Sequence, residues 1–287
     1  MARKIAIAII HGLGTTPPGF ADGMIAALKE DFARIAGADA DAALSLQPVH
    51  WSPVLKRSED ELWRRVAQDR SLRFAGLRRF LVGFAADALA YQPADGDHGR
   101  YAAVHTVVAQ ALRALAATDR AAPLVVIAHS LGSVIACDHF RDLARESRRL
   151  RTRVRDAVNP AARGGPLEKG ETLTCLYTLG CPLPLWSLRY DDLGSPITVP
   201  SPQLARHHPR LPPLGGWENY YDAADIFSFP LRTLNPAFAQ AVRKDVPVDV
   251  GSLLTTWNPL AHTGYWTDAE VIAPIARRFV ALWEAAQ

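Results

Sequence analysis

The chain has 287 residues, of which 49% are hydrophobic and 21% charged, and its formal net charge is +3. This composition suits one large soluble domain. So small a charge, with no known nucleic-acid-binding motif, excludes nucleic acid as the expected partner. No stretch is apolar for long enough to cross a membrane, and the run IAIAII near the N-terminus is too short for a secretory signal.

Cysteine usage predicts a reduced, cytoplasmic compartment. The three cysteines, Cys137, Cys175 and Cys181, are irregularly spaced and do not form a disulfide framework. No CxxC or HExxH motif indicates a metal site, so we expect no metal and no organic cofactor. Seven arginines crowd residues 141–155. They form either the solvated end of a helix or a patch that faces an anionic partner or membrane surface.

Short apolar runs alternate with amphipathic stretches along the chain. The apolar runs predict strands at residues 4–10, 43–51, 123–128, 171–180, 217–222 and 246–251. Helical spacing of apolar residues predicts helices at about residues 20–35, 134–145 and 269–286. Buried strands that alternate with helices predict an α/β fold with a mostly parallel, doubly wound sheet.

Two segments fit this alternation poorly. We interpret them as insertions at strand ends within a single domain that spans residues 1–287. Residues 182–216 are proline-rich and irregular, whereas residues 55–100 are helical and partly amphipathic. The carboxyl ends of parallel strands are where ligands bind, so we expect residues 55–100 to form a cap or lid there. The alternative is a pair of helices that pack on the sheet away from any site.

The stretch PLVVIAHSLGSVIACD (123–138) places a serine between a strand and a helix. A sharp turn at that point lifts the Ser130 hydroxyl out of the sheet. It also crowds the residues two before and two after the serine, and Ala128 and Gly132 are both small. With His129 before the serine, the pattern indicates a nucleophile elbow of the G-x-S-x-G type with alanine first. The alternative is a serine that only caps a helix.

The first predicted strand ends in IIHGLG (9–14), a turn that contains His11 and Gly12. Such a turn can offer the backbone N–H of Leu13 to a substrate at Ser130, and Leu131 can offer a second N–H. Two donors of this kind form an oxyanion hole for a tetrahedral intermediate. The alternative is a plain glycine turn. It is not a phosphate-binding loop, because the G-K-[ST] ending is missing.

A serine nucleophile needs a base, and the base needs an orienting carboxylate. In the chain order serine, acid, histidine, the acid follows a late strand and the histidine precedes the last helix. WENYYDAADIFSFPL (217–231) supplies Asp222 and Asp225, and NPLAHTGYWTD (258–268) supplies His262. Position alone leaves both aspartates open as the acid.

These motifs resemble the α/β-hydrolase superfamily, and within it the class 3 lipases. The resemblance covers the elbow VIAHSLGS, the strand and turn YTLGCPLP with Cys181 in place of a serine, and the acid and histidine motifs DIFSFPL and HTGYW. In the family pattern the acid begins a D-[IV]-x-x-x-P run, which corresponds to Asp225. Residues 55–100 and 182–216 match no pattern of the family.

The resemblance implies an α/β-hydrolase fold and ester hydrolysis of a small-molecule acyl substrate through an acyl-enzyme. Ser130 would attack the carbonyl, His262 would carry the proton and Asp225 would orient the imidazole. The same residues suit a thioesterase, an amidase or an acyltransferase. A binding protein with a hydrolase-like fold and no turnover is the remaining alternative.

Overall fold

A computed structural model gives the conformation of most of the chain. It describes residues 3–14, 16–68, 73–76, 78, 87–92, 99–144, 164–250 and 261–287. Within these residues, six parallel strands form one sheet in the order β2-β1-β3-β4-β5-β6. The strands are β1 (Ile5–Ile10), β2 (Leu44–Val49), β3 (Leu124–His129), β4 (Leu173–Leu179), β5 (Gly216–Tyr221) and β6 (Val242–Pro247). The predicted α/β class with a parallel sheet is confirmed.

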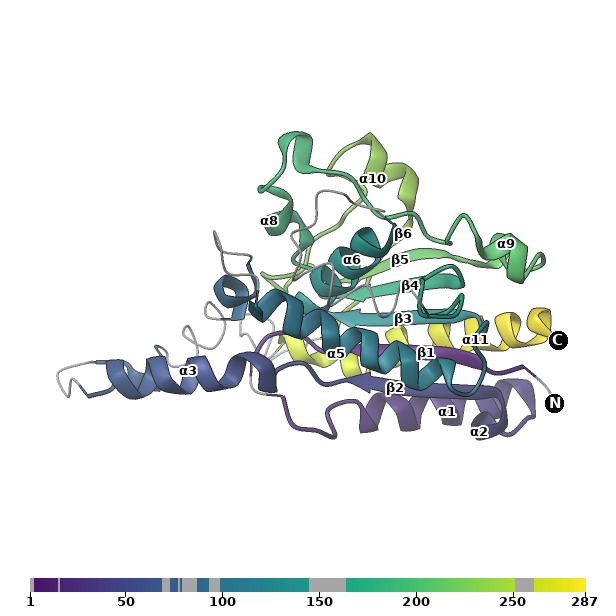
Figure 1. Ribbon diagram of the computed structural model, residues 1–287, viewed down its shortest axis with the longest axis horizontal. Coiled ribbons are helices and arrows are strands. Elements are labelled where there is room, and N and C mark those ends of the chain that lie inside the picture. The colour runs from purple at the N-terminus through teal and green to yellow at the C-terminus, as the bar shows by residue number, and fades with distance from the viewer. Residues whose placement is uncertain are drawn as a thin grey trace.

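Helices cover both faces of the sheet, as a doubly wound architecture requires (Figure 1). The α-helices are α1 (Asp22–Ala36), α2 (Ala40–Ala43), α3 (Pro53–Val66), α5 (Gly99–Ala116), α6 (Leu131–Ala144), α8 (Leu183–Ser187), α9 (Leu204–His207), α10 (Pro236–Ala241) and α11 (Ala269–Ala286). Short 3-10 turns are η1 (Asp191–Leu193), η2 (Pro212–Leu214) and η3 (Ala261–Trp266). Helices α1 and α11 pack on one face of the sheet, and α5 and α6 pack on the other.

Alternate residues of β1 enter the two halves of the core. Ile5, Ile7 and Ile9 pack with α1 and α11, while Ala6 and Ala8 pack beneath α5 and α6. Because both faces are covered, the strand reads as one apolar run and not as an alternating pattern. Each buried isoleucine contributes about 2 kcal/mol to the hydrophobic stabilisation of the fold.

The strand order reverses between β1 and β3, and this position defines the site. From β1 the chain runs through α1 to β2 on one side, and it then returns past β1 to β3 on the other side. In open α/β sheets, ligands bind beyond the carboxyl ends of the strands at such a switch point. The turns that follow β1 and β3 hold residues 11–14 and Ser130.

The two edge strands carry the residues that depart most from an apolar run. β2 contains Pro48, which an edge strand tolerates because one side of it needs no ladder donor. β6 begins at Val242, so the strand expected at residues 246–251 was placed too late. Its first half includes the exposed Arg243 and Lys244. Charged residues on an edge strand prevent it from pairing with strands of other chains. They also interrupt the apolar run, so the pattern of apolar residues does not predict the first half of β6.

The described part of the first insertion leaves the predicted cap untested. Helix α3 extends away from the sheet beyond the carboxyl ends of the strands (Figure 1). Residues 69–72, 77, 79–86 and 93–98 lie outside the described residues. The same holds for residues 145–163, and therefore for most of the arginine-rich segment. The second insertion consists of short helical turns joined by irregular chain.

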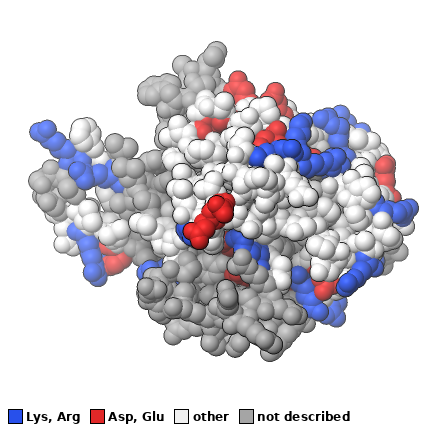
Figure 2. All heavy atoms as spheres, turned by 90° about the horizontal axis from the view of Figure 1, so that it is seen from above, with Lys and Arg blue, Asp and Glu red and all other residues white. Residues whose placement is uncertain are grey.

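Charges of both signs are spread over the face seen in Figure 2. Basic side chains occur on the projecting part of the molecule and, on the opposite side, toward the chain termini. On α3, Arg64 and Arg65 both pair with Glu61. Arg141, the one arginine of this segment that lies among the described residues, pairs with Asp138 at 2.6 Å.

Candidate active site

Ser130 occupies a sharp turn between β3 and α6. Its φ is +52°, a left-handed conformation that costs a residue with a side chain roughly 1–2 kcal/mol. The Ser130 N–H still donates to Leu179 O at 2.9 Å, so the turn begins directly at the end of the sheet. Such strain in a non-glycine residue is typical of functional sites. Ser130 is 1% exposed.

Gly132 permits the first turn of α6 to approach the end of β1. A β-carbon at this position would lie 2.6 Å from His11 O and 2.7 Å from Ile10 O. Ala128, the other small residue of the predicted elbow, is buried at the end of β3, and its carbonyl accepts a hydrogen bond from Ser133 Oγ at 2.9 Å. Gly132 is therefore required for the contact between α6 and the end of β1.

The turn after β1 lies directly against the serine. A β-carbon on Gly12 would lie 2.5 Å from Ser130 Cβ and 3.1 Å from Ser130 Oγ. Leu13 follows this contact in the chain. Leu131 is the first residue of α6, where backbone N–H groups have no intrahelical acceptor. The structure thus brings both predicted donor residues into the two turns that meet at Ser130.

His262 lies in η3 and pairs with Asp225 in the loop after β5. Its Nδ1 is 2.7 Å from Asp225 Oδ2, and both residues are buried. Burial acts to raise the pKa of the Asp225 carboxyl, but hydrogen bonding and attraction to His262 outweigh it and lower the pKa below its ordinary value. The N–H of Phe227 adds to this effect. The carboxylate therefore accepts the Nδ1–H of the imidazole.

Asp222, the other candidate acid, contacts backbone instead of histidine. Its Oδ1 accepts the N–H of Ala224 at 2.7 Å, and its Oδ2 accepts the N–H of Val250 at 3.0 Å. These bonds tie the loop after β5 to the loop after β6. Of the two aspartates, only Asp225 has a carboxylate oxygen bonded to an imidazole in the described part of the chain.

Tyr265 joins the acid loop to the histidine turn, a role that the sequence analysis did not assign. Its hydroxyl donates to Asp225 Oδ2 at 3.1 Å and accepts the N–H of Asp222 at 2.9 Å. Burial, followed by the Asp225 charge, raises the pKa of Tyr265, so the phenol remains a donor. The sequence places this aromatic residue three positions after His262, but that spacing alone does not indicate a hydrogen bond to Asp225.

Ser130 Oγ and His262 Nε2 are both buried, and neither has a hydrogen-bond partner among the described residues. His262 is held near the serine through its neighbour, because His129 Nε2 donates to His262 O at 2.6 Å. Catalytic hydrogen bonds are often long in proteins without a bound substrate, and they tighten when the substrate binds. Most buried polar groups in native proteins are paired, so a serine hydroxyl and an imidazole nitrogen that both lack partners call for an explanation.

The other two histidines beside the serine are neutral and committed to backbone contacts. Burial, and then the proximity of His262, lower the pKa of His129 to about 3, and its Nε2–H is used by His262 O. Burial also lowers the pKa of His11 to about 3. His262 Nε2, by contrast, is buried and has no hydrogen-bond partner among the described residues.

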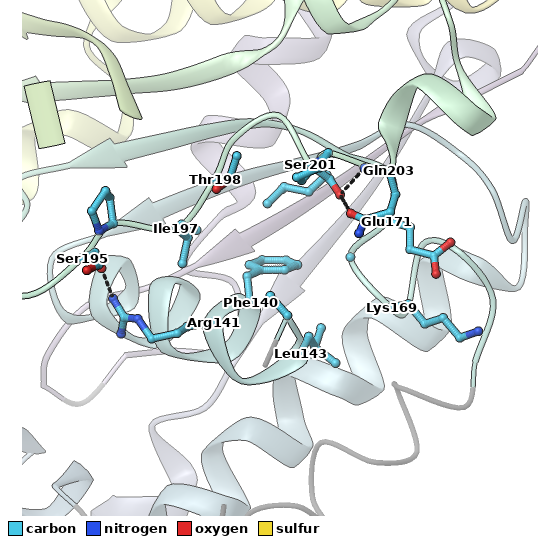
Figure 3. Close-up of a pocket in the computed structure, with 15 residues that line it drawn as sticks. Phe140, Arg141, Leu143, Lys169, Glu171, Ser195, Ile197, Thr198, Ser201 and Gln203 are labelled. Carbon is cyan, nitrogen blue, oxygen red and sulfur yellow. Dashed lines mark hydrogen bonds between the residues drawn. The ribbon is translucent and has the colours of Figure 1, made fainter. Parts of the chain in front are cut away.

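A groove of about 850 Å³ lies at the far end of α6, away from Ser130 (Figure 3). Because α6 has 14 residues, its two ends are about 20 Å apart. Two of its polar side chains are already bonded within the groove, since Ser201 Oγ donates to Gln203 Oε1 and Arg141 donates to Ser195 O. The groove is not part of the candidate active site.

Comparison with known proteins gives no relative for this chain, because neither a family model nor a curated protein matches it. Residues 3–144 and 164–287, apart from their undescribed gaps, include no helix that is both long and apolar enough to span a bilayer. The same residues hold no group of three or more His, Cys, Asp or Glu side chains placed to bind a metal ion. A reaction class must therefore be argued from the site itself.

Proposed function

We propose that the chain is a serine hydrolase that cleaves an ester bond through an acyl-enzyme. The observation that carries this proposal is the buried Asp225–His262 pair beside a strained serine. The imidazole is oriented at 2.7 Å by the carboxylate, and its other nitrogen and the Ser130 hydroxyl both lack a hydrogen-bond partner in the part of the chain that the structure describes. A serine that only capped a helix would need neither the pair nor the left-handed turn.

In the proposed reaction, Ser130 Oγ attacks the ester carbonyl while His262 Nε2 accepts the hydroxyl proton. The imidazolium that forms is stabilised by Asp225, and it then gives the proton to the leaving alcohol. Water attacks the acyl-enzyme by the same route and releases the acid. No further reactant is needed, because each proton taken by His262 is returned within the same half-reaction.

The developing oxyanion would be stabilised by backbone N–H groups of Leu13 and Leu131. Donors of this kind are effective because they are already oriented when the charge appears, and losing one costs about 10²–10³ in turnover. The position of Leu131 at the first turn of α6 adds the positive end of the helix dipole. Both features favour a tetrahedral anion at the same point above the sheet.

The test is labelling by a fluorophosphonate probe, which reacts only with an activated serine. We expect covalent labelling of Ser130, identified by mass spectrometry of the digested protein. Absence of labelling in the folded protein would refute the hydrolase proposal and leave a binding protein with the same fold. A panel of soluble esters, thioesters and amides then separates an esterase from enzymes that use the same residues on other acyl compounds.

A further inference from the structure

The turn at residues 11–14 is held from outside by a carboxylate of the 55–100 insertion. Gly14 N–H donates to Asp87 Oδ2 at 2.7 Å, and Asp87 is 1% exposed. Asp87 lies in a helical turn at residues 87–91. A buried carboxylate is costly unless hydrogen bonds compensate it, so this contact is not incidental. Gly14 directly follows Leu13.

The same turn is held from its other side by the segment that leads into the insertion. His11 Nε2 accepts the backbone N–H groups of Trp51 and Ser52 at 3.2 and 3.3 Å. The indole of Trp51 returns a hydrogen bond to His11 O at 2.8 Å. The two rings are stacked, with centroids 4.7 Å apart and planes 10° from parallel. Trp51 and Ser52 stand immediately before α3.

The chemistry of His11 fits this structural role. Because Nε2 accepts two N–H groups, the ring hydrogen is on Nδ1, which lies 2.8 Å from Gly12 O. Burial keeps the imidazole neutral at physiological pH. His11 is thus an acceptor for the segment before α3 and a donor to its own turn.

We propose that Asp87 and His11 are positioning residues that fix the Leu13 turn against Ser130, so that their contacts set the position of the oxyanion donor. The proposal rests on the proposed hydrolase function. Neither residue touches the substrate; both act through the backbone of residues 11–14. A donor must be held within about 0.5 Å of its productive position by packing and by hydrogen bonds from surrounding residues.

The experiment compares Asp87→Ala with Asp87→Asn in the full chain, using a short soluble ester. We expect Asp87→Ala to lower kcat by about 10² with KM changed less than about threefold, since the donor acts in the transition state. Asp87→Asn retains an oxygen that accepts the Gly14 N–H, so it should keep most of the activity. His11→Phe, which keeps the stacking but removes both nitrogens, should resemble Asp87→Ala.

Asp142→Ala is the matched control. Asp142 accepts a hydrogen bond from Tyr101 at 2.8 Å near the far end of α6, so its loss removes a comparable bond away from the turn. We expect this variant to lose stability and to keep kcat. Equal kcat in the folded Asp87→Ala and Asp142→Ala proteins would overturn the proposal.

Amide hydrogen exchange in residues 11–14 gives a second measurement that does not depend on activity. Exchange there should be faster in Asp87→Ala than in the unaltered protein or in Asp142→Ala. If the unaltered protein neither labels nor hydrolyses esters, the hydrolase proposal fails while exchange still tests the contact. Unchanged exchange in Asp87→Ala would overturn the positioning role whether or not the protein is an enzyme.

Discussion

Gly12 and Ser130 lie so close that a β-carbon on the glycine would be 2.5 Å from Ser130 Cβ. β-carbons of residues that are not neighbours in the chain do not approach so closely, so the two turns meet only because residue 12 lacks a side chain. The contact couples the end of β1 to the end of β3 at the point where the strand order reverses.

Gly12→Ala should therefore destabilise the fold by about 1–3 kcal/mol and displace Ser130. The measured quantities are the urea midpoint of unfolding and the rate of fluorophosphonate labelling. Both should be lower in the variant. Gly76→Ala is the matched control, because a β-carbon there meets nothing within 4 Å. An alanine at position 12 that left both quantities unchanged would contradict the close approach of the two turns.

Ser130→Ala should abolish labelling and lower turnover by about 10⁶ while leaving the fold intact. Ser130→Gly should be equally inactive but more stable than Ser130→Ala by about 1 kcal/mol, because glycine adopts φ of +52° without the strain of a β-carbon. Circular dichroism and thermal unfolding check both variants. Ester hydrolysis that persists in either one would show that another group is the nucleophile.

Asp225→Asn should lower turnover by about 10⁴, because an amide facing His262 Nδ1 favours the wrong tautomer. Asp222→Asn should have a much smaller effect on turnover, since its oxygens accept backbone N–H groups. Steady-state kinetics of the two variants on one ester decide between the aspartates. A larger loss for Asp222→Asn would reverse the assignment of the acid.

Four buried histidines should make stability fall as the pH drops below about 6.5. Burial lowers the pKa of His11 and His129 to about 3, that of His139 to about 4, and that of His105 as well. At low pH the unfolded chain binds protons on these histidines that the folded chain does not bind. The contribution of the neutral histidines to the free energy of unfolding is therefore complete above the unfolded pKa and is lost as the pH falls toward the folded pKa values. Each of these histidines lowers the free energy of unfolding by roughly 1 kcal/mol at about pH 5.5.

Urea unfolding at about pH 7.5 and about pH 5.5 tests this pH dependence. The midpoint should be clearly lower at the acidic value, a range in which most carboxylates stay ionised. Equal midpoints would mean that these imidazoles are protonated in the folded protein.

The predicted cap can be tested by measuring whether hydrolysis depends on a lipid–water interface. Residues 79–86 of the expected cap lie outside the described residues, but Leu89 and Leu188 are each 73% exposed in segments that follow β2 and β4. We expect hydrolysis of a long-chain ester to rise severalfold above its aggregation point. Leu89→Gln with Leu188→Gln should reduce that rise and leave a short soluble ester unaffected. Smooth saturation without a rise would indicate a fixed cap or helices remote from the site.

The central strands and the elbow could be predicted because each is a local pattern. An apolar run buried on both faces needs no knowledge of its partners, and a serine between a strand and a helix carries its own small neighbours. β6 was placed too late because its first half is charged. Asp87 was missed for a different reason: its acceptor role depends on Gly14, 73 residues away, and no spacing rule reports such a contact.

The packing of α11 against α1 has a consequence for synthesis of the chain. The apolar face of β1 and α1 is covered by Ile275 and Phe279 of α11. On the ribosome that face stays open until residues 269–286 have been translated, and transiently exposed apolar surface favours aggregation. A nascent chain of this protein should therefore require chaperone protection until α11 emerges.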